Sequence, residues 1–262
     1  MTPQRKITPA RGYSIPLSLP RKLVCDLIHF ARKIPTVPVQ RVMDLHALAE
    51  IRSAGTPRIG WTAIFTKAFG IVSQEMPELR RAYLEYPRPR LYQHPTSAAS
   101  VAVERDFAGE PGVFFAYVPE PETLSLDELD AAIHRFKTAP LEDEFAFTFG
   151  FYRYPRVLRR LAWWWILNVR GSRKAEFLGT FGISAYAGLG SESLHPLSPL
   201  TATLNYGVIG PDGLVPVRII YDHRVMDGAT VARALLRMEE VLTRDVSDEL
   251  SRLSRPAARA AV

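Results

Sequence analysis

The sequence has a single cysteine, Cys25, among its 262 residues, so it cannot form a disulfide within one chain. No apolar run is long enough to cross a bilayer, and no apolar stretch with a cleavage site follows the basic first residues. His29, His46 and His94 have no partners at metal-ligand spacing, so we expect no metal site. These absences favour a cytoplasmic location in a reducing compartment. Cys25 falls within a helical pattern, and we expect it to be a small core residue.

The composition is that of an ordinary globular protein, and the length suits one large core. We predict an N-terminal arm at residues 1–19, one domain at 20–245, and a basic tail at 246–262 that frays. The formal net charge is +6, but lysine and arginine are spread along the chain apart from one cluster, so binding to nucleic acid is not predicted. A small molecule that carries several phosphates would also suit a basic surface.

Periodic spacing of apolar residues predicts the main elements. Helical spacing favours a helix after Pro20 and others over Trp61–Glu75 and Ser125–Lys137, the last with a capping box of Ser125 and Glu128. Alternating patterns favour strands over four further ranges: Val37–Met43, which we place near a sheet edge because of its prolines, Ala98–Glu104, Val113–Val118 and Leu200–Ile209.

A candidate site lies around His223. The alternating strand Val215–Tyr221 leads to this histidine, and Asp227, Gly228 and a helical pattern follow it. A neutral imidazole can take a proton from a thiol, alcohol or amine near neutral pH, so His223 is a candidate general base. Asp227 could hold the turn by accepting hydrogen bonds from the helix start or by pairing with a distant arginine. Gly228 would let the chain turn where a side chain would clash. The alternative is a strand-end histidine beside an aspartate that only caps the helix.

The block from Tyr221 to Ala229, reading Tyr-Asp-His-Arg-Val-Met-Asp-Gly-Ala, resembles the signature of the acyltransferase (E2) catalytic domain of 2-oxoacid dehydrogenase complexes. That family shares its fold and an H-x-x-x-D-G motif with chloramphenicol acetyltransferase. The block from Gly179 to Ser184, Gly-Thr-Phe-Gly-Ile-Ser, is similar to the family's G-T-F-T-I-S strand. The resemblance covers residues 20 to 245. It implies an α+β fold, a two-layer sandwich of mixed β-sheet and helices, that assembles as a trimer.

The resemblance also implies a reaction. His223 of one subunit would deprotonate a thiol, hydroxyl or amine acceptor, and Ser184 of its neighbour would stabilise the oxyanion formed on a coenzyme A thioester. No cofactor would be tightly bound. In the relatives an arginine near the first helix pairs with the aspartate of the turn, so Arg21 is the candidate partner of Asp227. Two rivals lie on the same helix: Lys22 and Arg32.

The resemblance leaves the acceptor open. Only the short arm precedes the catalytic region, so we expect a stand-alone acyltransferase without a lipoyl domain. A lipoyl or carrier protein supplied in trans, or a small alcohol or amine, could be the acceptor. The trimers could also build a larger cage.

Residues 145–175 form an aromatic and basic insert where the family has a short polar link. The insert carries Trp163, Trp164 and Trp165. It could be a helix buried against the protein with arginines on its outer rim, a segment lying in a membrane interface, or the wall of an enlarged pocket for a long acyl chain. A nucleic-acid stacking platform is not expected, because adjacent aromatic residues on a helix point to different faces. Six basic residues flank the tryptophans: Arg156, Arg159, Arg160, Arg170, Arg173 and Lys174.

Two further classes of function stay open. The chain could be a non-catalytic trimeric scaffold of the same fold, or a partner protein docked on a membrane. The condensation domains of peptide synthetases share the H-x-x-x-D-G motif. They are, however, much longer, and they carry a second histidine where this sequence has Tyr221 and Asp222.

Overall fold

The structure is a computed structural model, and it describes residues 12–185 and 187–254. Residues 1–11 of the expected arm and residues 255–262 of the expected tail lie outside the described residues. Residues 12–18 of the arm are irregular, and helix α1 (Leu19–Ala31) follows them, close to where apolar spacing after Pro20 predicts it.

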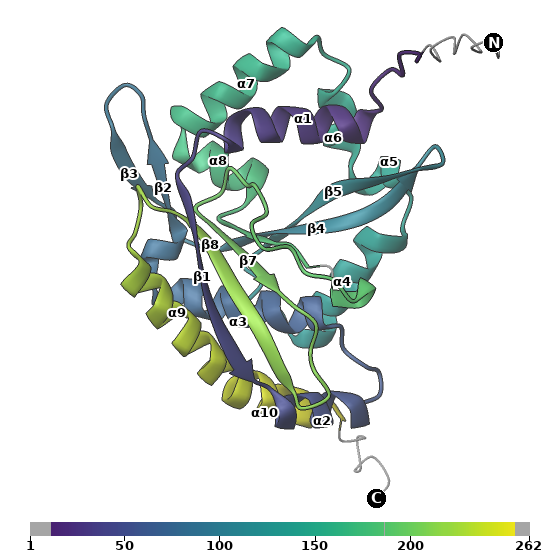
Figure 1. Ribbon diagram of the computed structural model, residues 1–262, viewed down its shortest axis with the longest axis vertical. Coiled ribbons are helices and arrows are strands. Elements are labelled where there is room, and N and C mark those ends of the chain that lie inside the picture. The colour runs from purple at the N-terminus through teal and green to yellow at the C-terminus, as the bar shows by residue number, and fades with distance from the viewer. Residues whose placement is uncertain (1–11, 186, 255–262) are drawn as a thin grey trace, which may run out of the picture.

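A six-stranded mixed sheet forms the centre of the molecule (Figure 1). Strand β6 runs parallel to both of its neighbours, and the other neighbouring pairs are antiparallel. β1 is an edge strand, as its prolines predict, and the predicted pairing of β4 with β5 is confirmed. The strands follow one another across the sheet as β1 (Thr36–Asp44), β8 (Leu214–Asp222), β7 (Ala202–Tyr206), β6 (Phe181–Ile183), β4 (Ala98–Phe107) and β5 (Glu110–Pro119).

Helices pack on the sheet and enclose the main core, which confirms the predicted α+β fold. α3 (Trp61–Glu75) has the predicted bounds, and the predicted capping box of α4 (Leu126–Thr138) is formed. The same layer includes α2 (His46–Ala54), α9 (Gly228–Val241), a π-helical turn (Leu242–Val246) and α10 (Ser247–Ser254). Shorter elements lie between these: 3-10 turns at Pro77–Arg80 and Ala187–Leu189, the hairpin β2 (Arg81–Leu84) and β3 (Arg90–Gln93), and α5 (Leu141–Glu144).

Two expectations, one about the C-terminal boundary of the domain and one about Cys25, are wrong. The folded domain does not stop at residue 245, because α10 continues it and buries Leu250 against the core. Cys25 is exposed on α1 rather than buried. The buried side of that helix instead carries Asp26, a charged residue that periodicity alone would place in water.

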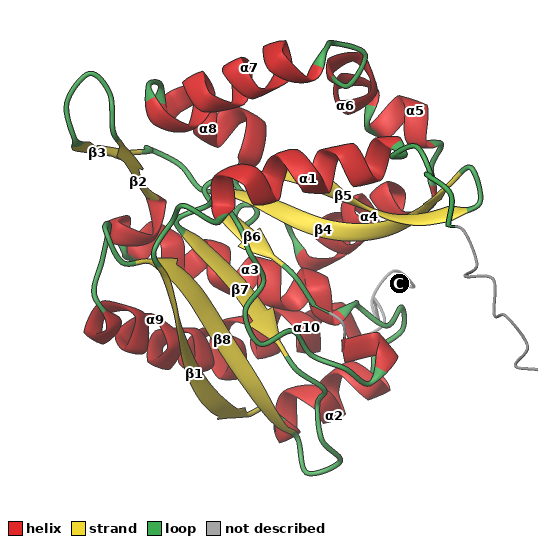
Figure 2. Ribbon diagram, turned by 45° about the horizontal axis from the view of Figure 1, so that its top comes forward, coloured by secondary structure: helices red, strands yellow, loops and turns green. Residues whose placement is uncertain are grey.

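The insert forms three helices, α6 (Ala146–Phe151), α7 (Arg156–Asn168) and α8 (Gly171–Leu178), which lie with α1 beyond the β4–β5 end of the sheet (Figure 2). Trp163 packs on Phe30 of α1 with ring centroids 6.3 Å apart. The first interpretation of the insert is therefore correct in that α7 packs against the protein. Its arginines do not all lie on the rim, since Arg159 is buried and forms an ion pair with Asp26 at 3.0 Å.

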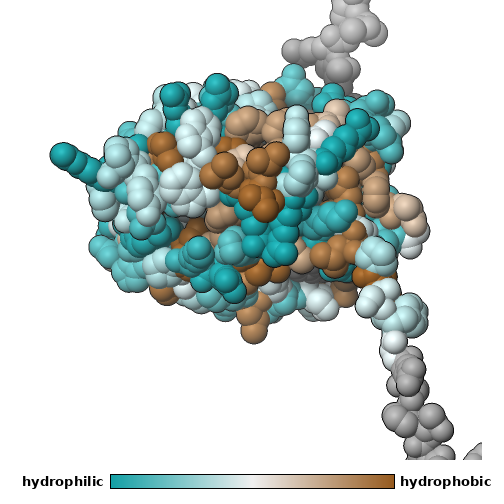
Figure 3. Space-filling model, turned by 90° about the horizontal axis from the view of Figure 1, so that it is seen from above, coloured by the Kyte–Doolittle hydropathy of each residue, from teal (hydrophilic) through white to brown (hydrophobic). Residues whose placement is uncertain are grey.

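The outward face of α7 remains apolar and exposed. Val157 is 77% and Leu161 61% exposed, and hydrophobic residues gather among hydrophilic ones in the view onto this end of the molecule (Figure 3). Trp164 contacts the Tyr86 ring with centroids 5.2 Å apart. None of the helices within residues 12–185 and 187–254 has the length and hydropathy needed to cross a membrane.

Candidate functional site

The turn that carries His223 is tied to two neighbouring strands. The backbone N–H of Asp222 donates to the carbonyl of Thr201 at 2.9 Å, and that of His223 donates to the carbonyl of Pro35 at 3.1 Å. Val225 closes the turn by donating its N–H to the Asp222 carbonyl at 3.0 Å. His223 is therefore presented from a fixed backbone between strand β8 and helix α9.

The imidazole of His223 lies beside a carboxylate. Its Nδ1 is 3.6 Å from Oδ1 of Asp227, and the two side chains are 50% and 85% exposed. A carboxylate on this side favours the tautomer with the proton on Nδ1, which leaves Nε2 free to accept a proton. Half exposure leaves the ring accessible to a reactant. The imidazole and the carboxylate are thus neighbours, but at 3.6 Å they are just beyond hydrogen-bond distance in the single chain.

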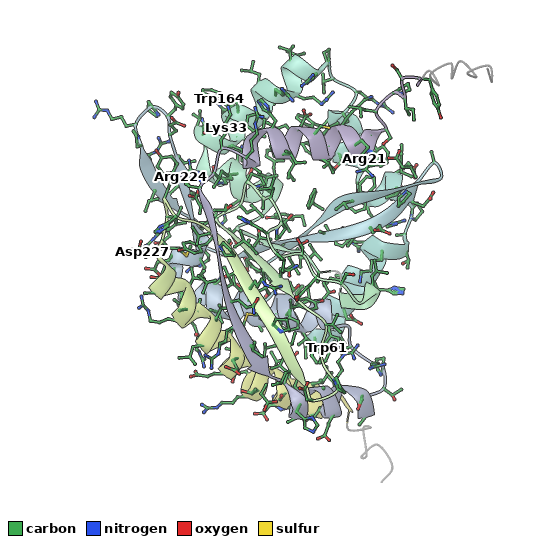
Figure 4. All side chains as sticks on the ribbon, in the orientation of Figure 1. Arg21, Lys33, Trp61, Trp164, Arg224 and Asp227 are labelled. Carbon is green, nitrogen blue, oxygen red and sulfur yellow. The ribbon has the colours of Figure 1, made fainter. Side chains whose placement is uncertain are left out.

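Asp227 does not act on the turn as expected. It occupies the N-cap position of α9, but its side chain makes no capping hydrogen bond. Nor does the single chain form the expected pair with Arg21, whose Nε binds Oε1 of Glu110 at 3.2 Å. Figure 4 shows Arg21 and Asp227 on opposite sides of the molecule. The carboxylate is left with His223 as its ion-pair partner within the described chain.

The expected reason for Gly228 is also wrong. Its backbone is not left-handed, and a Cβ at this position would meet only the hydroxyl of Tyr221 at 3.4 Å, an ordinary contact. Within one chain a side chain at Gly228 would therefore not clash.

A charge cluster beneath the turn, in which Asp222 and Lys174 are buried, is absent from the site predicted from the sequence. Asp222 accepts hydrogen bonds from Arg224 at its backbone N–H (3.0 Å), Nε (2.9 Å) and Nη2 (2.7 Å), and the guanidinium lies 4.3 Å from the Tyr83 ring centroid. Burial lowers the pKa of Lys174 in α8 to about 8, although the Asp222 carboxylate opposes this change. The insert therefore reaches the underside of the His223 turn. The available signal was an aspartate at the end of a mainly apolar strand.

Ser184 follows directly after strand β6. Its backbone N–H donates to the Leu204 carbonyl at 3.0 Å, and its own carbonyl accepts a hydrogen bond from the side-chain amide of Asn205. Its half-buried side chain lines a cavity of about 420 Å³. Both contacts fix the backbone of Ser184 at the edge of that cavity.

The sheet register separates Ser184 from His223. Ser184 follows Ile183, which is level with Leu204 and, through it, with Ile219. The position of Ser184 is thus level with Arg218, five residues before His223. Five residues span about 17 Å along a strand and two strand spacings add about 10 Å across the sheet, so the two positions lie roughly 19 Å apart. A single chain does not bring Ser184 and His223 together.

The cavity is walled by α1, the outer faces of β4 and β5, and all three helices of the insert. Alternation along β4 and β5 sends Val101 and Phe114 into the main core but Ala102 and Phe115 towards the cavity. Trp163 and other insert residues line it, so the interpretation of the insert as a pocket wall is confirmed. The volume falls within the range of about 300–1,000 Å³ that is typical of ligand pockets.

The described residues contain no group of three or more His, Cys, Asp or Glu side chains that could hold a metal ion. An imidazole and a hydroxyl, the side chains at the two candidate positions, can transfer a proton and donate a hydrogen bond.

The fold is that of the catalytic domains of dihydrolipoamide acetyltransferases. The enzyme of Azotobacter vinelandii matches with a TM-score of 0.68 at 18% identity, over 94% of this chain and 98% of that chain. A probable dihydrolipoamide acetyltransferase from Listeria monocytogenes gives 0.61 at 15% identity, over 95% and 99%. A truncated 2-oxoacid dehydrogenase catalytic core from Thermoplasma acidophilum gives 0.63 at 16% identity, over 89% and 99%. No family model and no curated protein matches the sequence.

Proposed function

We propose that the protein is an acyltransferase that moves an acyl group from a coenzyme A thioester to a thiol, hydroxyl or amine acceptor. The observation that carries the proposal is the distance between two well-formed half-sites. His223 with Asp227 forms a base that is open to solvent, and Ser184 faces a cavity roughly 19 Å away across the sheet. The two groups can act on one acyl carbon only if they come from different subunits. We therefore propose a homotrimer with its active sites between subunits.

In the proposed reaction, Nε2 of His223 takes the proton of the acceptor as the acceptor attacks the thioester carbonyl. The Ser184 hydroxyl of the next subunit donates a hydrogen bond to the oxyanion that forms. The intermediate then collapses, the carbon–sulfur bond breaks, and the imidazolium returns its proton to the leaving thiolate. Asp227 stabilises the imidazolium and keeps the ring in the productive tautomer.

One comparison supports the assignment of these residues. The Azotobacter structure was determined to study the catalytic roles of a serine, a histidine and an asparagine, the last two of which are four residues apart. His223 and Asp227 have the same spacing in this chain. Here a carboxylate replaces the amide, and a carboxylate stabilises an adjacent imidazolium more strongly.

The acceptor and the assembly belong to the same proposal. Similar structures include the cubic core of a pyruvate dehydrogenase multienzyme complex. We propose that trimers of this chain can likewise build a cage, and that a lipoyl or carrier protein delivers the acceptor in trans.

Docking on an anionic membrane is a second candidate role, and the outward face of α7 favours it. Val157 and Leu161 are exposed there, beside positive charges. These charges also act on His29, whose pKa is lowered mainly by burial and further by nearby cations. The cations are Arg160, Lys33, Arg32 and Arg156. Apolar side chains beside cations are typical of surfaces that bind anionic bilayers. Co-sedimentation with phosphatidylglycerol vesicles tests this role, and a Val157→Ser/Leu161→Ser variant should lose the binding.

The acyltransferase proposal is tested with His223→Ala and a panel of acyl-CoAs, following release of free thiol with lipoamide or a small amine as acceptor. We expect the variant to lose turnover while its oligomeric mass stays unchanged. His46→Ala, at an exposed position on α2, is the matched control and should keep the wild-type rate. Turnover that persists in His223→Ala would refute the proposed role of His223 as the base, and an absence of turnover with every donor and acceptor would refute the proposal in favour of a non-catalytic scaffold.

A further inference from the structure

We infer that the cavity beside Ser184 binds the hydrocarbon chain of the acyl group, so that the protein selects medium or long unbranched acyl thioesters over acetyl-CoA. This inference rests on the proposed function, because it identifies the substrate of the same site.

The lining of the cavity carries no charge. None of the described residues that line it is Asp, Glu, Lys, Arg or His, and most are aliphatic or aromatic. The phosphates of coenzyme A and a charged amine acceptor would both lose hydration there without gaining a partner. A hydrocarbon chain would instead bury its surface at a gain of about 0.8 kcal/mol per methylene. The cavity thus suits an alkyl chain and excludes the ionic parts of both substrates.

The polar groups of the cavity include a cluster around Ser184. Ser184 and Gly182 lie on the same face of the chain at β6, and Gly182 pairs with Thr203 of β7. The Thr203 hydroxyl oxygen is buried and has no hydrogen-bond partner within the described chain. A substrate carbonyl placed at this end would meet two hydroxyl groups. The opposite walls, from α1 and the insert, offer mainly apolar side chains.

The position of Ser184 decides which part of a substrate occupies the cavity. In the proposed reaction its hydroxyl contacts the oxygen of the acyl carbonyl. The carbonyl carbon bears the acyl chain and the thiol sulfur, and the acceptor atom adds to it during the reaction; of these three groups, the acyl chain is the one that suits the uncharged lining. Because Ser184 is part of the cavity wall, the chain continues from the carbonyl into the cavity. An acetyl group would leave most of the 420 Å³ unfilled.

The insert supplies much of the apolar wall. Its contribution comes from all three helices: Phe147 and Phe151 of α6, Trp163 and Ile166 of α7, and Phe177 and Leu178 of α8. The rest of the apolar wall comes from strands β4, β5 and β6, from the loop before β7, and from α1, through Leu23, Val24, Leu27 and Ile28. The floor stays open at Gly182, where a Cβ would lie 3.2 Å from the Thr203 hydroxyl and 3.3 Å from Leu200. The insert, which stands where the related family has a short polar link, is thus the segment that makes room for an acyl chain.

The test compares acetyl-, hexanoyl-, decanoyl- and palmitoyl-CoA with the full-length protein. We expect kcat/KM to rise about tenfold or more from acetyl- to decanoyl-CoA, because each buried methylene adds up to about fourfold in affinity. Ala102→Phe and Thr148→Phe place a ring in the cavity from two different walls and should lower the ratio of decanoyl to acetyl turnover by about tenfold. Ala131→Phe, at an exposed position on α4, should leave the ratio unchanged.

A binding measurement separates this inference from the proposed reaction. A fluorescent dansyl-undecanoic acid probe should bind the wild-type protein, and Ala102→Phe and Thr148→Phe should weaken it about tenfold, whether or not any donor is turned over. His223-dependent turnover of acetyl-CoA with no gain for longer chains would refute the inference and leave acyl transfer standing. Probe binding without turnover of any donor would refute the reaction and support the cavity as a binding site. A probe that does not bind, or that binds equally to the filled variants, refutes the inference.

Discussion

The ion pair between α1 and α7 offers a quantitative test of how the insert is held. The side chain of Asp26 is only 2% exposed. Its carboxylate accepts hydrogen bonds from Nε of Arg159 at 3.0 Å and from Nε of Arg160 at 3.3 Å. Asp26→Asn keeps the shape of the side chain and removes its charge. Arg159 then remains buried without a counter-charge, and breaking a buried pair in this way costs about 3–5 kcal/mol.

The expected loss lies at the lower end of that range. Arg160 is more exposed and can turn towards water, and Arg159 keeps its hydrogen bond to the Tyr154 carbonyl at 2.9 Å. Its guanidinium also lies 4.7 Å from the Tyr152 ring centroid. A loss of about 3 kcal/mol lowers the ratio of folded to unfolded insert roughly 100-fold.

Urea unfolding followed by tryptophan fluorescence measures this loss. Three of the four tryptophans lie side by side in α7, so fluorescence reports mainly on the insert, whereas far-ultraviolet circular dichroism reports on the whole chain. Asp26→Asn should move the fluorescence transition to lower urea. Glu176→Gln, which removes the exposed partner of Arg173, should move it by less than about 0.5 kcal/mol.

A double variant checks the physical reason. Asp26→Leu with Arg159→Met replaces the pair by apolar side chains and should recover most of the stability that Asp26→Asn loses. A loss below about 1 kcal/mol in Asp26→Asn, or a double variant as unstable as the single one, would show that the pair does not hold α7.

Three further predictions concern the site and the segment that leads into it. Lys174 has a pKa of about 8 in the folded state against an ordinary value of 10.5, so the unfolded chain binds more protons between those values. The free energy of unfolding should therefore rise from about pH 8 to about pH 10.5, and Lys174→Met should lack this rise in urea titrations. Gly179→Ala forces a side chain onto φ +81°, with its Cβ 2.7 Å from the Ala98 carbonyl oxygen. It should lose at least about 1–2 kcal/mol, and an unchanged melting temperature would contradict the reasoning. Ser184→Ala should reduce kcat by about 10²–10³ if its hydroxyl meets the oxyanion, and mixed oligomers of Ser184→Ala and His223→Ala subunits should regain activity.

The elements with strong periodicity could be predicted from the sequence. α3 has the predicted bounds because its apolar spacing is continuous over four turns, and α4 begins within one residue of its predicted start because Ser125 and Glu128 form the capping box there. The inward position of Asp26 could not be predicted, since it depends on an arginine from a helix far along the chain. The exposure of Cys25 has the same origin, because the arrival of α7 decides which side of α1 is covered.

The candidate site was predictable only where its members are close in sequence. His223 and Asp227 are four residues apart, and their side chains meet in the structure. Arg21 was assigned to Asp227 through the resemblance. It lies instead at the start of α1, where its neighbour is Glu110 on β5. Lys174 joins Asp222 and Arg224 only through the packing of α8 under the turn, which no local spacing encodes.

In the proposed assembly, the separation of Ser184 and His223 within one chain makes turnover sensitive to dilution. A separated subunit would keep its cavity and, with it, the inferred binding of an acyl chain, but its serine would have no histidine across from it. Turnover per subunit should therefore fall once the protein concentration drops below the dissociation constant of the assembly. Acyl groups bound to isolated subunits would be stored rather than transferred until subunits associate again.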